Sequence, residues 1–123
     1  MVTKTEKDNI KPYITKDGSS IRELMHPEKN GNSGQSLAEA LVPAGAETLL
    51  HKHMKTEEIY HIEEGRGLMT VGGEVFTVTA GDSVYIPPET PHRIKNMGNT
   101  ILRLLCCCVP PYSHENTLLV IDE

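Results

Sequence analysis

The feature that most limits the fold of this chain is a succession of short alternating segments separated by glycine and proline turns. Between Leu68 and Thr79, for example, two apolar runs flank the pair Gly72-Gly73, which suits the positive φ angles of a two-residue hairpin. Similar segments recur about every 8–12 residues, a spacing typical of an all-β sandwich or barrel. Helical periodicity is weak, and its best candidate is one turn within residues 19–27, ended by Pro27. We therefore predict an all-β fold.

The chain of 123 residues has the size of a single domain. We predict an N-terminal arm or edge strands over residues 1–30 and a β-barrel over residues 31–123. Arms of this kind often add to the sheet of a neighbouring subunit, which covers an otherwise exposed edge. Together with the C-terminal LLVIDE tail, the arm predicts a homodimer.

Composition excludes several classes of partner. The net charge of −5 and the lack of a basic stripe argue against nucleic acid. No apolar stretch approaches the roughly 18 residues of a membrane span, and the polar N-terminus lacks the apolar core of a signal peptide. We expect a cytoplasmic protein that binds a small molecule and has neither nucleic-acid nor membrane partners.

Histidines supply the chemical signal. His51 and His53 are two residues apart, so an extended strand points both imidazoles to the same face. Glu58 follows five residues later, and His92 lies in the segment IPPETPHRIKN. Three neutral imidazoles and one carboxylate make a site suited to a first-row transition metal.

These residues carry a resemblance to the cupin superfamily, because both of its sequence motifs have counterparts here. The first motif is glycine, five residues, His-x-His, three or four residues, glutamate, six residues and glycine, and it is matched by Gly45, His51, His53, Glu58 and Gly65. The second is matched by Gly81, Pro87, His92 and Asn96, whereas Glu89 stands where the family usually has glycine. The chain is similar to small single-domain cupins of the conserved-barrel type, and more loosely to phosphomannose isomerase-like and oxalate decarboxylase-like cupins.

The resemblance implies a jelly-roll-like β-barrel with a divalent transition metal inside. Carried over by position, the metal ligands are His51, His53, Glu58 and His92. This mixed ligand set does not choose among Mn, Fe, Ni, Co and Zn. Four protein ligands leave up to two open positions on a six-coordinate metal, where water, dioxygen or a substrate can bind.

Strand alternation separates Glu58 from its neighbour Glu57, because only one of them can face inward. Six residues separate Glu58 from Gly65, as the motif requires, and Glu58 shares a strand face with Tyr60. We therefore expect Glu57 to face outward. Tyr60 is a candidate catalytic residue, since its hydroxyl could orient a bound oxygen or donate a proton, whereas we expect Tyr85 to pack in the core.

The cysteines are three in a row, Cys106, Cys107 and Cys108. An odd, clustered set does not describe a disulfide framework, and burial as small apolar side chains in a reducing compartment is the simplest interpretation. Alternation allows either Cys107, or Cys106 together with Cys108, to line the cavity near the metal. The sequence does not fix which.

Three functions are compatible with these observations. The first is an isomerase-like metal enzyme that acts on a small sugar, sugar phosphate or carboxylate, although the chain has no glycine-rich phosphate loop. The second is an iron-dependent dioxygenase, which would require that the cysteines near the site be buried. The third is a non-enzymatic small-molecule binding or sensor module. Whether the protein is an enzyme stays open at this point.

Overall fold

The computed structural model describes residues 2–121, which form a barrel of two antiparallel sheets. The first sheet contains, in spatial order, β1 (Tyr13–Ile14), β2 (Ser20–Met25), β3 (Ser36–Val42), β10 (Leu102–Val109), β5 (Glu57–Glu64) and β8 (Ser83–Ile86). The second contains β11 (Thr117–Leu119), β4 (His51–His53), β9 (His92–Asn96), β6 (Arg66–Val71) and β7 (Glu74–Thr79). The helices of this part of the chain are η1 (Lys7–Asn9) and α1 (Pro27–Asn30). The predicted all-β fold is confirmed.

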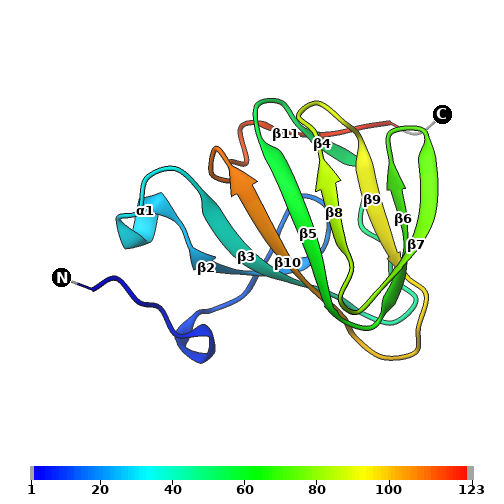
Figure 1. Cartoon of the computed structure of the whole chain (residues 1–123), viewed down its shortest axis with the longest axis horizontal. Coiled ribbons are helices and arrows are strands. Elements are labelled where there is room, and N and C mark those ends of the chain that lie inside the picture. The colour runs from blue at the N-terminus through cyan, green and yellow to red at the C-terminus, as the bar shows by residue number, and fades with distance from the viewer. Residues whose placement is uncertain (1, 122–123) are drawn as a thin grey trace.

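The N-terminal part of the chain lies against one side of the barrel. Figure 1 places η1, β2 and α1 on the side of the molecule remote from β6 and β7. Lys7 of η1 and Arg22 of β2 both form ion pairs with the buried Glu39 of β3, at 3.2 and 3.4 Å. The predicted boundary near residue 30 stays a prediction. Among the described residues, no helix is long and apolar enough to span a membrane.

Strand alternation places the core between the sheets. On β5, Tyr60 and Ile62 are buried, whereas Ile59 is 47% exposed. The side chains of the packed core that are exposed by 1% or less include Ile62, Met69, Ile86, Ile94, Leu102 and Leu104. Their burial supplies the apolar contribution that holds the sheets together.

Small side chains on β3 leave room for a cavity at one end of this core. The inward-facing residues Ser36, Ala38 and Ala40 are all buried. They pair across the sheet with Cys108, Cys106 and Leu104 of β10, respectively. Because only short side chains project from β3, the opposite walls cannot close against it, and the resulting space lies beside the histidines.

Two turns form as the sequence predicts. β6 and β7 pair up to Val71 and Glu74, so Gly72-Gly73 closes a two-residue hairpin, with Gly72 at φ 59°. Gly65 ends β5 at φ 92°, and a Cβ atom there would lie 2.9 Å from the carbonyl oxygen of Ile101. A side chain at position 65 is therefore excluded by both backbone conformation and space.

Two local predictions are wrong. Residues 20–25 form strand β2 instead of a helical turn, because this segment pairs with β3 over most of its length. Pro27 begins α1 instead of ending a helix, as expected for a residue whose missing N–H is harmless in the first turn. Tyr85 is 54% exposed, since its neighbour Ile86 takes the inward position on β8.

Candidate metal centre

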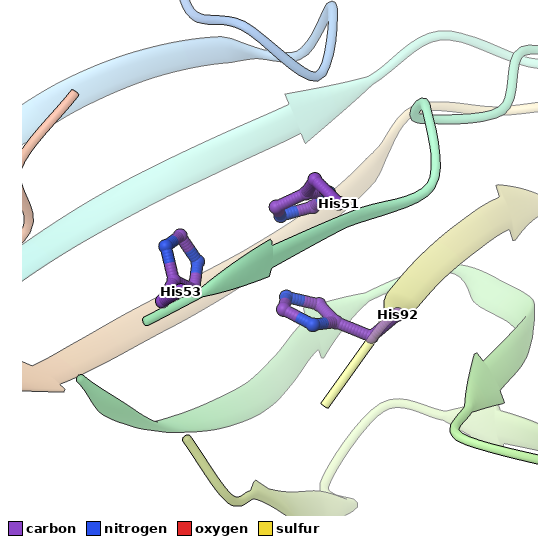
Figure 2. Close-up of side chains that lie close together, drawn as sticks. All are labelled: His51, His53 and His92. Atoms are coloured by element: carbon purple, nitrogen blue, oxygen red, sulfur yellow. The ribbon is translucent and has the colours of Figure 1, made fainter. Parts of the chain in front are cut away.

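Three buried histidines meet inside the barrel. β4 presents His51 and His53 to the same side, because they are two residues apart on a strand. His92 is the first residue of β9 and lies opposite His51 in the β4–β9 pairing. One ring nitrogen of each histidine lies within 4.8 Å of one ring nitrogen of each of the others. Figure 2 shows the three rings turned toward one another, and this group could hold a metal ion.

Hydrogen bonds at Nδ1 decide which nitrogen faces the centre. The Nδ1 atoms of His51 and His92 lie 2.8 and 2.9 Å from backbone carbonyl oxygens, which can only accept, so both nitrogens donate. His53 Nδ1 lies 2.9 Å from the hydroxyl of Thr117, whose own hydrogen is donated to the carbonyl of Ser113. His53 Nδ1 therefore donates as well. In the neutral rings, all three Nε2 lone pairs remain available to a metal.

Glu58 completes the group from the facing sheet. Its Oε1 atom lies 3.2 Å from His53 Nε2 and 3.3 Å from His92 Nε2. The other oxygen, Oε2, accepts a hydrogen bond of 3.3 Å from the thiol of Cys108. Oε1 of Glu58 and Nε2 of His92 are buried atoms with no hydrogen-bond partner among the described residues. Leaving two such atoms unsatisfied would cost about 1–3 kcal/mol each.

A cation between these atoms would remove that cost. Neighbouring ligand atoms about 2.1 Å from a six-coordinate metal lie roughly 3 Å apart. The distances from Glu58 to His53 and His92 are close to this spacing. The residues present therefore fit a divalent transition metal, and they still do not choose among Mn, Fe, Ni, Co and Zn. The roles of His51, His53, Glu58 and His92 as ligands stay predictions.

Burial and neighbouring side chains shift the pKa values of Glu58 and His51. Burial alone would raise the pKa of Glu58, but the adjacent His53 and His92 hold it well below its ordinary value. Burial is the main cause that lowers the pKa of His51 to about 4, and the adjacent His92 acts in the same direction. His51 is therefore neutral at pH 7, which is the form that binds a metal.

The lining of the cavity beside the histidines decides between Cys107 and the pair Cys106 and Cys108. Cys106 and Cys108 line it, and Cys107 faces the outside. Burial raises the pKa values of both cavity thiols, so they are protonated. The cavity has a volume of about 40 Å³, which is enough for about three ordered water molecules.

Comparison with known proteins identifies the family. A cupin domain model matches residues 38–108, which is more than half of the chain. The chain is a cupin.

Individual relatives agree with this assignment. A Methanocaldococcus jannaschii protein of uncharacterized function is 64% identical over 116 residues, covering 94% of this chain and 93% of that protein. The crystal structure of a predicted oxalate decarboxylase from Thermotoga maritima is similar with a TM-score of 0.76 and 29% identity, and the match covers 89% of this chain and 99% of that one. The polyketide synthase protein CurC of Streptomyces cyaneus is 29% identical over 90 residues, 73% of this chain and 58% of CurC.

The second cupin motif contains one residue with a purely structural role and one departure. Asn96 is buried, and its amide donates to the carbonyls of Val42 and Thr100 while its oxygen accepts from the N–H of Gly98. Glu89, at the family's usual glycine position, has φ 64°. The loop thus keeps the left-handed conformation that glycine favours, although the residue is not glycine.

Sequence reasoning missed two carboxylates of the cupin's cavity wall. Asp17 lies in the turn between β1 and β2, and Glu23 lies on β2. Both belong to the segment that we expected to be an arm. The dipeptide Asp17-Gly18 is a hairpin signal that could have located the turn, but no local pattern says that this turn reaches the histidines.

The remaining predicted positions fall on both sides of the sheet. Tyr60 is buried in the cavity wall, with its ring centroid 5.8 Å from that of His92. Its catalytic role stays a prediction. Glu57 faces outward as expected, and its carboxylate accepts a hydrogen bond from the hydroxyl of Tyr85.

Proposed function

We propose that this cupin is a divalent-metal enzyme that moves protons on a small, unphosphorylated hydroxy-carbonyl compound, in an isomerase-like reaction. The observation that carries the proposal is the group of three buried histidines, two of which direct Nε2 lone pairs at the partnerless Oε1 of Glu58, beside a cavity that also contains titratable carboxylates. When bound, the metal would act as a Lewis acid toward a substrate oxygen. The protein must then supply the group that exchanges the proton.

Glu23 is suited to that task. Its side chain is 10% exposed, and its nearest partner is His26, at 3.9 Å. His26 Nε2 donates to the carbonyl of Tyr112, and its Nδ1 accepts from the N–H of Glu28, so both ring nitrogens already have hydrogen-bond partners other than Glu23. Burial outweighs His26 and Lys29, each of which lowers the pKa of Glu23. Burial raises its pKa, which brings a carboxyl closer to the range in which it can both take and return a proton.

Glu23 also stands at the boundary between two spaces. Together with Tyr13 and Tyr112 it lines both the inner cavity and a more open outer hollow near α1. A substrate that enters from the outer hollow and reaches the histidines passes this carboxyl. A proton donor or acceptor at that position is within the path of the substrate.

The charges of the cavity favour an unphosphorylated substrate. Three carboxylates, Asp17, Glu23 and Glu58, line the inner cavity, and no lysine or arginine of the described residues does so. A phosphate group would be repelled there and would find no cationic clamp. Hydroxyl groups can instead bond to the carboxylates and to the tyrosine and threonine hydroxyls of the wall.

The dioxygenase alternative meets its requirement that Cys106 and Cys108 be buried, but it fits the cavity less well. The thiols of Cys106 and Cys108 line the same space as the histidines, and Cys108 touches Glu58. Activated oxygen formed next to these thiols would oxidise them. Proton transfer places no such demand on the cavity wall.

Hydrogen exchange into substrate is the direct test. Protein loaded separately with Mn(II), Fe(II) or Zn(II) is incubated in D₂O with free aldoses and ketoses, with their phosphates, and with small hydroxy and keto acids. Proton NMR then follows the loss of C–H signals. We expect metal-dependent exchange in a free sugar-like compound, its loss in Glu23→Gln, and its retention in Glu57→Gln, a matched carboxylate on the outer face.

Other outcomes would favour the alternatives. Oxygen uptake that occurs only with iron would support the dioxygenase. Inertness with every metal, alongside tight binding of one of the compounds, would support a binding or sensor module. The homodimer also stays a prediction, and a sedimentation run that returns a monomer would contradict it.

A further inference from the structure

The turn between β1 and β2 is built to hold Asp17 against the histidines. Within the turn, Thr15 N–H donates to the carbonyl of Ser19 and Gly18 N–H donates to the carbonyl of Thr15, with Gly18 at φ 92°. The N–H of Leu49, two residues before His51, donates to the carbonyl of Asp17 at 2.8 Å. The turn is thereby fixed to the chain that carries the first histidine, and Asp17 is 8% exposed.

The two oxygens of the Asp17 carboxylate have different surroundings. Oδ1 accepts hydrogen bonds from the backbone N–H and the hydroxyl of Ser19, at 2.9 and 2.6 Å. Oδ2 lies 3.5 Å from Nε2 of His51. Because His51 Nδ1 carries the ring hydrogen, Nε2 presents a lone pair, and the two facing atoms are both electron-rich. Such a contact is unfavourable unless a cation lies between them.

Glu58 shows the same arrangement at the other two histidines, His53 and His92. Its Oε1 atom faces the Nε2 atoms of His53 and His92 at 3.2 and 3.3 Å without a hydrogen bond. Two carboxylates therefore approach the three-histidine group, and each directs an oxygen at an unprotonated nitrogen. One metal ion bound by the three histidines would attract both.

We propose that Asp17 Oδ2 is a fifth protein ligand of the metal centre, supplied by the β1–β2 hairpin. This inference rests on the metal centre proposed above. A six-coordinate metal with three histidines, Glu58 and Asp17 has one open position instead of two. A substrate would then bind the metal through a single oxygen, and the cavity wall would hold the rest of the molecule.

Asp17→Asn tests the proposal because a fifth ligand predicts two effects of opposite sign, a lower metal affinity and an equal or higher stability of the metal-free protein. The asparagine Oδ1 keeps both bonds to Ser19, so the turn is preserved. Its Nδ2 replaces Oδ2 and can donate to His51 Nε2, which converts the unfavourable contact into a hydrogen bond. At pH 8 we expect the affinity for Mn(II) and Co(II), measured by chelator competition, to fall about 100-fold. The metal-free variant should melt no lower than the wild type, and up to about 3 °C higher.

Two further variants separate the possible results. Glu23→Gln changes a buried carboxylate of the same cavity whose histidine partner is His26 and not one of the three at the metal centre, and it should keep the metal affinity within about threefold. The visible absorption of bound Co(II) should change in Asp17→Asn and stay the same in Glu23→Gln. Unchanged affinity and spectrum in Asp17→Asn would overturn the fifth ligand, and so would a weaker affinity with an unchanged spectrum. If His92→Ala also binds metal normally, the metal centre itself is wrong, which is a distinct failure.

Discussion

The same strands form both ends of the barrel, but one end surrounds a cavity and the other end is packed. Along β5 the inward residues run from Glu58 to Ile62, and along β10 they run from Cys108 to Leu102. At one end the side chains are polar or small and surround a cavity. At the other end they are large, apolar and fully packed. A single alternation pattern thus produces an open end with a cavity and a packed end.

Buried polar groups show the difference most clearly. At the packed end, the side chain of Asn96 uses its amide twice as a donor and its oxygen as an acceptor. At the cavity end, Glu58 Oε1 and His92 Nε2 have no hydrogen-bond partner among the described residues. A buried amide with all its hydrogen bonds made stabilises the loop around it. Buried polar atoms without a partner, next to a cavity, are candidates to bind an ion or water. Each prediction below asks whether the two ends behave differently.

The largest expected effect is a loss of packing. Ile62→Ala removes a fully buried side chain from the packed end, and we expect the free energy of unfolding to fall by about 3–4 kcal/mol. Cys106→Ala, on the cavity wall, should cost only about 1 kcal/mol because its neighbours already face open space. Urea unfolding measures both. Equal losses at the two positions would contradict the division into a packed and an open end.

The next effect is a pH dependence that originates at the cavity end. His51 has a pKa of about 4 in the folded chain, because burial disfavours its charged form, against 6.5 as its ordinary value. Below pH 6.5 the unfolded chain binds a proton that the folded chain does not, so stability falls as the pH decreases toward 4. The loss is at most about 3 kcal/mol. Urea unfolding of metal-free protein between pH 7 and 4 measures it.

The control is a difference between two proteins, which removes the contribution of all groups other than His51. His51→Gln should have a flatter profile than the wild type between pH 6.5 and 4, while both share the contribution of the remaining groups. Parallel profiles would mean that His51 is already charged in the folded state, and that its Nε2 does not face the cavity as a free lone pair.

Glu58→Gln should lower metal affinity without lowering stability. The affinity for Mn(II) should fall about 100-fold, which corresponds to about 2.7 kcal/mol. At pH 8 the amide can donate to a histidine nitrogen, so the metal-free protein should melt no lower than the wild type. Chelator competition and calorimetry give the two values. Glu57→Gln, one residue away on the outer face, should change neither. A large loss of stability in metal-free Glu58→Gln would show that the carboxylate has a structural role.

The sequence alone was sufficient for the parts of this molecule that depend on local spacing. His-x-His on a strand, the six residues between Glu58 and Gly65, and the Gly72-Gly73 hairpin each follow from backbone geometry over a few residues. Asp17 and Glu23 could not be placed in this way, because their positions depend on the pairing of β2 with β3. The cysteines illustrate the same limit: alternation gave two choices, and only the register of β10 against β5, with Cys108 opposite Glu58, selects one.

The smallest expected effect concerns strain in the loop that leads to His92. Glu89 is exposed and adopts φ 64°, and its N–H donates to the carbonyl of His53 at 2.7 Å. A non-glycine residue at this positive φ angle costs about 1–2 kcal/mol of stability. Glycine removes this cost, but part of the gain is lost because glycine gives the unfolded chain more conformational entropy. We expect Glu89→Gly to raise the free energy of unfolding by up to about 1 kcal/mol. Glu89→Ala removes the charge but keeps the strain, so it should give no gain. If both variants are equally stabilised, the charge of Glu89 is responsible, and the strain at the cavity end is relieved by other contacts of the loop.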